Sequence, residues 1–212
     1  MDQNEALKQQ LIRQLVNQKE EANVIFEQLW RSGHGWHSDG SLRGLDLSGA
    51  QLEMSDLKDA DLRNVNFTGA SLFEVRGENT NLQNANLIEV DLAGAGLLSV
   101  NLQDAILDRA TLRGVYLDGN LQGASFNEAN LSQSIIEGNL RNTSLRGANL
   151  QQTRFVTADF RGADFANADV TEATFEQCIF DETTILPNGA AWTPDNDFFK
   201  SDPPDKSGNH NT

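Results

Sequence analysis

The chain has 212 residues, with 16 lysines and arginines against 31 acidic residues, which gives a formal net charge of −15. This charge disfavours nucleic acid, an anionic membrane or a polyphosphate as direct partners, although a basic or DNA-binding protein stays open. The single cysteine, Cys178, excludes an internal disulfide framework, and a hydrophobic content of 38% is low for a globular core.

The length indicates one domain with short extensions. The N-terminus lacks the basic start and the continuous apolar run of a secretory signal, and no stretch is long and apolar enough for a transmembrane segment. We therefore expect a cytoplasmic protein with no membrane partner.

Residues 4–31 show helical periodicity in two parts. Apolar residues recur at helical spacing in each part: Leu7, Leu11, Ile12, Leu15 and Val16, then Ala22, Ile25, Phe26, Leu29 and Trp30. Between the parts, Asn17 and Glu20 are spaced like a capping box. We predict two short helices, with one bent helix as the alternative. Their expected task is to cover an open end of the following fold, and a partner-binding helix pair is the second hypothesis.

A link rich in glycine and histidine follows, so that residues 1–37 form the predicted helical cap and link. His34, His37 and Asp39 could be drawn as metal ligands, but their spacing is unspecific and no further His or Cys lies nearby. We therefore predict no metal site, and we expect Trp36 to pack over the start of the next segment.

From Leu42 to Ile185 a five-residue pattern repeats about 30 times. Each unit has a large apolar residue, which we call the centre, and a small residue two positions earlier, which we call the partner. Inward positions two residues apart are typical of a strand, and the Gly, Asn, Asp and Ser at outward positions suit a corner in every unit. Because no single coil can bury its apolar face alone, the pattern predicts a solenoid of stacked coils.

Several units share one form: Ala60-Asp61-Leu62, Ala85-Asn86-Leu87, Ala129-Asn130-Leu131, Ala148-Asn149-Leu150 and Ala163-Asp164-Phe165. Over two thirds of its length the chain resembles the pentapeptide-repeat family, whose motif is A(D/N)LXX. The resemblance implies one pentapeptide per side of a four-sided β-helix, with centre and partner pointing inward. We therefore predict an all-β solenoid, a right-handed quadrilateral β-helix of pentapeptide repeats over residues 38–187, with a short N-terminal α-helical cap.

Three positions interrupt the repeats. Gly77 stands where a centre belongs, which predicts a void in one wall or a bulge in the strand. The spacing of the centres also drops from five to four twice, at Gly119 and at Gly138. These two glycines lie one shortened coil apart, so we expect them to stack at one corner, where glycine accepts unusual dihedral angles. We favour a duplicated deletion over a functional notch as the interpretation.

The last coils and the tail differ from the rest. The centres change from mostly Leu to mostly Phe after residue 150, and we expect the rings to stack in the core: Phe155, Phe160, Phe165, Phe175 and Phe180. Cys178 holds a partner position, which indicates a small buried residue rather than a reactive thiol. Residues 188–200 form a predicted C-terminal cap segment in which Trp192 covers the last coil. Residues 201–212 are polar and expected to be disordered.

The sequence contains no Ser/His/Asp grouping, phosphate-binding glycine loop or metal-ligand cluster. We therefore predict no catalytic, cofactor-binding or metal-binding residues and no enzymatic activity. The leading hypothesis is a monomeric scaffold or protein-interaction module. The alternative comes from the family resemblance, because some members mimic acidic duplex DNA and bind DNA gyrase.

Two features of the sequence weigh against DNA mimicry. Several acids occupy the motif's Asp/Asn position, where turn chemistry accounts for them: Asp46, Asp56, Asp61, Asp91, Asp159, Asp164 and Asp169. Cations are also spread among the repeats: Arg43, Lys58, Arg63, Arg76, Arg109, Arg113, Arg141, Arg146, Arg154 and Arg161.

Overall fold

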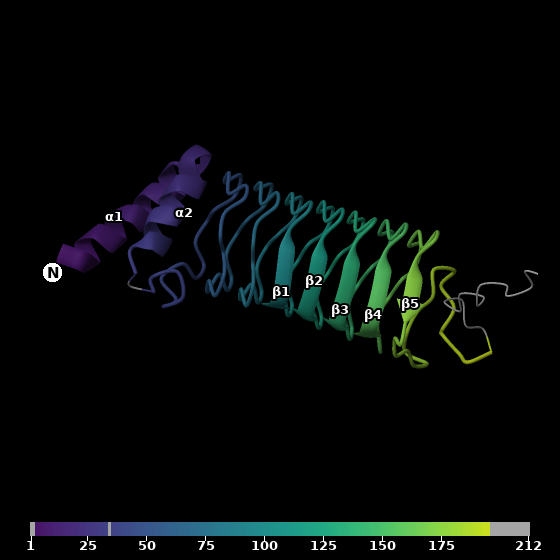
Figure 1. Ribbon diagram of the computed structural model, residues 1–212. Helices are drawn as coiled ribbons and strands as arrows, with labels where there is room; N and C mark the ends of the chain where they lie inside the picture. The colour runs from purple at the N-terminus through teal and green to yellow at the C-terminus, as the bar shows by residue number, and fades with distance from the viewer. Residues whose placement is uncertain (1–2, 34, 196–212) are drawn as a thin grey trace, which may run out of the picture.

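The computed structural model describes residues 3–33 and 35–195, and it places a pair of helices at one end of a long rod of stacked coils (Figure 1). The helices are α1 (Gln3–Asn17) and α2 (Ala22–Arg31), joined by a 3-10 turn, η1 (Lys19–Glu21). One side of the rod carries a parallel five-stranded sheet, in the order β1 (Gly96–Asn101), β2 (Tyr116–Asn120), β3 (Ile135–Asn139), β4 (Arg154–Asp159) and β5 (Thr174–Glu176). Neither described helix is long and apolar enough to cross a membrane.

Each regular coil has four sides of five residues. Bridges therefore join residues 20 apart, such as Asp46 and Asn66. The N–H of a centre donates to the next coil, as Leu47 does to the Asn66 carbonyl at 2.8 Å, and the N–H of Asn66 donates back to the Leu45 carbonyl at 2.9 Å. The same exchange recurs on all four sides, which confirms the predicted four-sided β-solenoid.

The centres and partners form one continuous apolar core. In the middle of the rod, the centres Leu92 and Leu107 and the partner Ala95 are no more than 1% exposed. Their outward neighbours are half-buried or exposed. The predicted inward and outward positions are therefore confirmed for these repeats, and stacking provides the core that no coil has alone.

Aromatic rings fill the later coils, as predicted. Phe155 and Phe175 stack along the rod with 4.9 Å between their ring centroids. The predicted last centre, Ile185, is wrong: Leu186 is the buried residue, and Ile185 holds the bridging position before it. The reason is one extra residue after Phe180, which shifts the phase of the final unit.

Corner geometry accounts for many of the outward residues. The second residue after a centre has a left-handed backbone, with φ of 58° at Asn64, and this conformation favours glycine and short polar residues. The carboxylate of the residue before the centre accepts a hydrogen bond from the backbone of the same turn: Asp91 Oδ1 accepts the Ala93 N–H at 3.0 Å. Asp169 makes the equivalent bond, and the hydroxyl of Thr171 holds the pKa of that carboxyl below its usual range.

One side of the rod carries a column of stacked amides, which we call the amide ladder and which consists of Asn81, Asn101, Asn120 and Asn139. The side-chain nitrogens of Asn101, Asn120 and Asn139 each donate to the side-chain oxygen of the asparagine in the previous coil, over 3.1 to 3.4 Å. A carboxylate held by two arginines stands at each end: Asp61 with Arg43 and Arg63, and Asp159 with Arg141 and Arg161. Neutral amides thus connect two clusters of ion pairs.

Gly77 lies in a filled part of the wall. A Cβ on this residue would lie 2.6 Å from Cδ2 of Leu97 in the next coil. The Gly77 N–H donates to the Gly96 carbonyl at 2.8 Å, so the strand pairing continues without a bulge. The predicted void or bulge is therefore wrong, because the Leu97 side chain occupies the space that the missing side chain leaves.

The two shortened coils stack at one corner, as predicted. Gly119 pairs with Gly138 on the adjacent strand, and their φ angles are 143° and 102°. A Cβ on Gly119 would overlap the carbonyl oxygen of Val100, and a Cβ on Gly138 would overlap that of Gly119. Because each coil lacks its left-handed corner residue, the chain stays extended through the corner in β2 and β3.

The helix pair covers the first coil and continues its backbone pairing. The N–H of Gln51 donates to the Lys19 carbonyl in η1 at 2.8 Å, and the N–H of Asn23 donates to the Gln51 carbonyl at 3.0 Å. Trp36, in the link, is buried within the same core. These contacts agree with the expected role of a cap.

The turn between the helices differs from the prediction. Neither Gln18 nor Glu21, which precede η1 and α2, caps its helix with a side chain. The Asn17 amide instead donates back to the Arg13 carbonyl at 2.8 Å. The predicted capping box between Asn17 and Glu20 is wrong, because α1 ends at Asn17 and no helix begins there.

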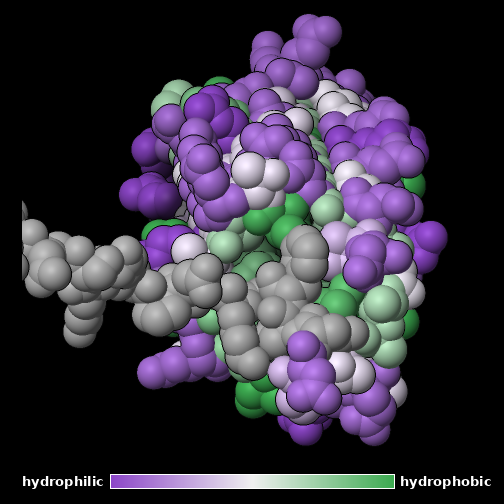
Figure 2. Space-filling model, turned by 90° about the vertical axis from the view of Figure 1, so that its right-hand side faces the viewer, coloured by the Kyte–Doolittle hydropathy of each residue, from purple (hydrophilic) through white to green (hydrophobic). Residues whose placement is uncertain are grey.

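A short hairpin closes the described C-terminal end. Ile185 pairs antiparallel with Ala191, and the Trp192 ring stacks on Phe180 with 5.9 Å between ring centroids. Viewed from this end, the rod is hydrophilic at its rim and apolar toward its centre (Figure 2). Trp192 therefore lies against the last coil, as expected. The rest of the cap segment, 196–200, and the predicted tail, 201–212, lie outside the described residues.

Candidate interaction surface

Of the residues considered as metal ligands, the two that the structure describes have other contacts. Within residues 3–33 and 35–195, no three His, Cys, Asp or Glu side chains converge as ligands would. Asp39 pairs with Lys8 at 2.7 Å, and the His37 ring packs on Trp30 with 4.1 Å between centroids. Burial lowers the pKa of His37 and so favours the neutral ring. His34 lies outside the described residues.

Cys178 is half-buried, at a partner position of the last regular coil. Its thiol donates to the Phe155 carbonyl at 3.6 Å, and burial raises the pKa of the thiol to about 11. A thiol that stays protonated near neutral pH is a poor nucleophile. Its surroundings therefore suit a core residue.

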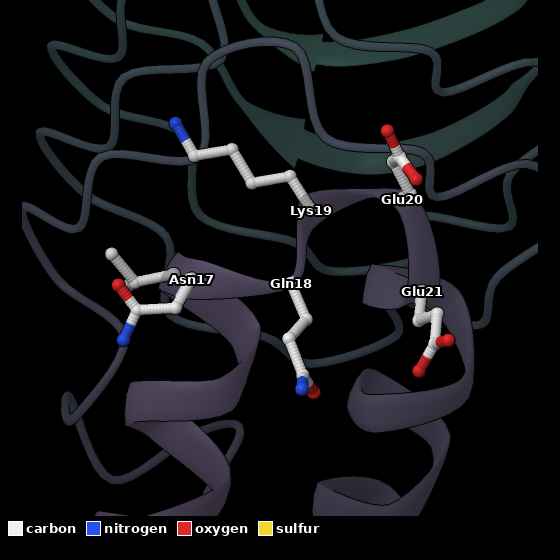
Figure 3. Close-up of a pocket in the computed structure, with 6 residues that line it drawn as sticks. Asn17, Gln18, Lys19, Glu20 and Glu21 are labelled. Carbon is white, nitrogen blue, oxygen red and sulfur yellow. The ribbon is translucent and has the colours of Figure 1, made fainter.

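The turn between the helices borders an open hollow of about 610 Å³ (Figure 3). Residues 16–21 line it, and Figure 3 shows that the labelled side chains point apart rather than toward a common centre. Lys19 reaches the first coil, where its Nζ lies 3.0 Å from Ser48 Oγ and 3.6 Å from the Asp46 carboxylate. The hollow is thus part of the cap and shows no convergent set of binding groups.

Exposed apolar side chains distinguish one wall of the rod from the others. We call it the sheet wall; it consists of the outward side chains of β1–β5. Four consecutive strands contribute a large apolar residue to it: Leu98 and Tyr116 are exposed, and Ile135 and Val156 are half-buried. On the other walls, the exposed large apolar residues of the coils are Met54, Phe73, Ile106 and Ile179. None of those walls carries large apolar outward residues, exposed or half-buried, on four coils in succession among the described repeats.

The outward side chains of the sheet wall form two columns along the rod. The first column contains Gly96, Tyr116, Ile135, Arg154 and Thr174. The second contains Leu98, Asp118, Glu137, Val156 and Glu176. Aliphatic and aromatic residues favour the extended backbone here, and the missing corner residues at Gly119 and Gly138 keep the wall continuous with the next side.

Carboxylates on the same side of the rod before β1, and the carboxylate of β5, have cation partners. The ion pairs are Arg76–Asp56 at 3.4 Å, Lys58–Glu78 at 3.3 Å and Arg154–Glu176 at 3.0 Å. Charge at the ends of the wall is therefore largely compensated within the chain.

The centre of the wall is different. Asp118 and Glu137 occupy paired positions on β2 and β3, and neither has a Lys or Arg within 4.0 Å among the described residues. The Tyr116 hydroxyl donates to Glu137 Oε1 at 3.0 Å, and this hydrogen bond raises the pKa of Tyr116. Two uncompensated carboxylates thus lie within the apolar strip.

A small hollow of about 190 Å³ lies where this side of the rod meets α2. It is lined by Glu27, Trp30, Arg31, Asp56 and Arg76. Its charged groups are paired: Arg31 lies 3.2 Å from Glu27, and Arg76 lies 3.4 Å from Asp56. The side of the rod that carries the sheet wall therefore ends, toward the helices, at an indentation whose apolar lining is the Trp30 ring.

Sequence reasoning located the shortened coils but missed the wall beside them. The available signal was the presence of Leu98, Tyr116, Ile135 and Val156 at outward positions, where the repeat usually has small or polar residues. Recognising that they share one wall requires following the 19-residue coils, which shift the phase twice.

Comparison with known proteins agrees with this geometry. The family model "Pentapeptide repeats" matches in 8 copies, over residues 41–76, 78–114, 97–138 and 139–183. No curated protein sequence matches the chain significantly.

Similar solved structures include HetL of the cyanobacterium Nostoc sp. strain PCC 7120, at 20% identity over 79% of this chain and 98% of that one, with a TM-score of 0.42. A second is QnrB1, described as a plasmid-mediated fluoroquinolone resistance protein, at 14% identity over 66% of this chain and 81% of that one, with a TM-score of 0.50. At these identities the likeness concerns the fold alone. With the family model covering most of the coils and each regular side five residues long, the chain belongs to the pentapeptide repeat family.

Proposed function

We propose that this protein is a non-enzymatic interaction scaffold and that its partner is a protein bound on the sheet wall. The observation that carries the proposal is the strip of apolar side chains on four consecutive strands. Apolar patches rimmed by polar residues mark interaction sites on soluble proteins. A cytoplasmic location and a monomeric rod are parts of the same proposal.

The rigidity of the rod supports this function. Backbone hydrogen bonds join successive coils around the sheet wall, for example from Tyr116 to the Ala95 carbonyl at 3.1 Å and from Ile135 to the Val115 carbonyl at 3.0 Å. Side chains on such a frame keep fixed spacings, so little conformational freedom is lost when a partner binds. The wall is thereby pre-organised for recognition.

DNA mimicry has weaker support. A duplex mimic needs a continuous negative face, because phosphate-binding grooves respond to charge density. Here many acids pair with cations from neighbouring coils, as in Arg109–Glu89 at 2.9 Å and Arg146–Asp164 at 2.7 Å. We therefore expect no effect on gyrase supercoiling at micromolar protein.

Position-specific cross-linking tests the proposal. A photoreactive phenylalanine analogue replaces Tyr116 in one variant and Ile106 in a control, because these side chains are 38% and 42% exposed on different walls. After irradiation in the native cell, we expect a defined protein adduct from position 116 and not from position 106. Equal adducts from both positions, or none from position 116, would contradict binding on the sheet wall.

A further inference from the structure

The centre of the sheet wall holds an unfavourable arrangement of charge. Asp118 and Glu137 pair on β2 and β3, and adjacent strands lie about 4.8 Å apart. Like charges opposite one another destabilise a sheet. Elsewhere in the described coils, an acid generally stacks on an amide, a cation or an uncharged residue of the next coil. Glu89, for example, stacks on Arg109. A bound cation at Asp118 and Glu137 would remove the repulsion.

The surroundings restrict the kind of cation. In the second column Val156 pairs with Glu137, and Leu98 directly follows Leu97, whose partner on β2 is the residue before Asp118; Tyr116 and Ile135 lie beside the acids in the first column. Two carboxylates among apolar groups are too few oxygen ligands for calcium, and magnesium keeps a hydration shell that these groups do not match. Nucleic acid is disfavoured because its phosphates carry the same charge as the wall.

Charge also argues against a second copy of this chain. Two sheet walls placed face to face would bring Asp118 and Glu137 of both copies together, within a chain whose formal net charge is already −15. The cation of the wall, Arg154, is engaged by Glu176, and Arg76 in the coil before β1 is engaged by Asp56. The complementary partner is therefore basic where this wall is acidic and apolar where it is apolar.

Among basic side chains, arginine matches the site better than lysine. A guanidinium group pairs with carboxylates through several N–H donors and also stacks on aromatic rings, whereas a lysine ammonium keeps a strong hydration shell. The Tyr116 ring lies next to the acids, since its hydroxyl bonds Glu137 at 3.0 Å. We infer that the partner is a protein segment that places an arginine over Asp118 and Glu137 and apolar side chains against Leu98, Tyr116, Ile135 and Val156.

This inference rests on the proposed function and adds the chemistry of the partner. The test uses isotope-labelled full-length protein and an acetylated, amidated peptide, Leu-Val-Arg-Val-Leu, followed by amide NMR shifts. A second peptide carries citrulline in place of arginine, which keeps the shape and removes the charge. We expect the arginine peptide to shift signals of β2 and β3 and to bind roughly tenfold more tightly than the citrulline peptide, with a preference that weakens as salt is added.

Matched variants separate charge from structure. The double variant Asp118→Asn, Glu137→Gln removes both charges, whereas Glu128→Gln removes one from an exposed corner of another wall. We expect the double variant to lose the preference for arginine and to unfold at a higher denaturant midpoint, and Glu128→Gln to keep the preference. Equal binding of the two peptides to the native protein, or a preference that survives in the double variant, would overturn the inference.

The two proposals fail in different ways. If position 116 cross-links a partner and the double variant still binds that partner unchanged, the scaffold function stands and the arginine contact is wrong. If position 116 gives no specific adduct, the proposed function itself is wrong.

Discussion

Replacing Gly119 with alanine tests whether the tightened corner depends on glycine. The residue has a φ of 143°, and a Cβ would overlap the Val100 carbonyl oxygen and lie 2.7 Å from the Val100 nitrogen. Both contacts are with backbone, so rotating a side chain cannot relieve them. The strained dihedral costs about 1–3 kcal/mol and the forced displacement about 1–3 kcal/mol more. We expect a loss of about 2–6 kcal/mol, a large share of a typical folding stability of about 5–15 kcal/mol.

Gly114→Ala is the matched control. Gly114 has a positive φ too, of 69° at a regular left-handed corner, but a Cβ there would meet no atom within 4 Å. Arg109 adopts the same conformation at an equivalent corner with φ of 58°, so we expect Gly114→Ala to cost only about 1–2 kcal/mol. Urea denaturation followed by circular dichroism measures both variants. If Gly119→Ala proved as stable as Gly114→Ala, the argument that backbone contact requires glycine would be refuted.

Three further measurements test the core, the cap and the thiol. Leu92→Ala should lower the free energy of unfolding by about 2–5 kcal/mol, because the side chain is only 1% exposed, and a loss below about 1 kcal/mol would contradict its inward position. Removing residues 1–37 should cause aggregation, because it removes the Lys19 carbonyl that accepts the Gln51 N–H and it uncovers the first coil. A soluble truncated chain of unchanged stability would show that the helices serve another purpose. Cys178 should react with a disulfide reagent at pH 8 at least about tenfold more slowly than in the urea-unfolded chain. A pKa of about 11 lowers the fraction of thiolate, and this loss of rate exceeds the gain from the greater nucleophilicity of a more basic thiolate. A rate equal to that of the unfolded chain would show that the thiol is not protected.

The repeat architecture could be predicted because the same physical requirement recurs in every unit. A small partner and a large centre two residues apart, followed by a turn, define inward positions without any long-range information. Leu92 could therefore be assigned to the core directly, and the stacking of Gly119 on Gly138 followed from their spacing.

The errors occurred where one coil compensates for another or where the phase changes. The space at Gly77 is filled by Leu97, which is 20 residues away, and a local pattern does not show how a neighbouring side chain will turn. Ile185 was misassigned because a single extra residue precedes Leu186. The sheet wall was missed for a related reason: Tyr116 and Ile135 become neighbours only when the coils are aligned in space.

The middle and the two ends of the amide ladder should respond differently to ionic strength. Its three central hydrogen bonds join the neutral amides from Asn81 to Asn139, and added salt leaves such bonds largely unaffected. The carboxylates at its ends, Asp61 and Asp159, are held by partly exposed arginines, and salt screens contacts of that kind. Concentrated salt should therefore loosen this side first at its two extremities, while the middle coils, which hold β2 and β3, keep their spacing.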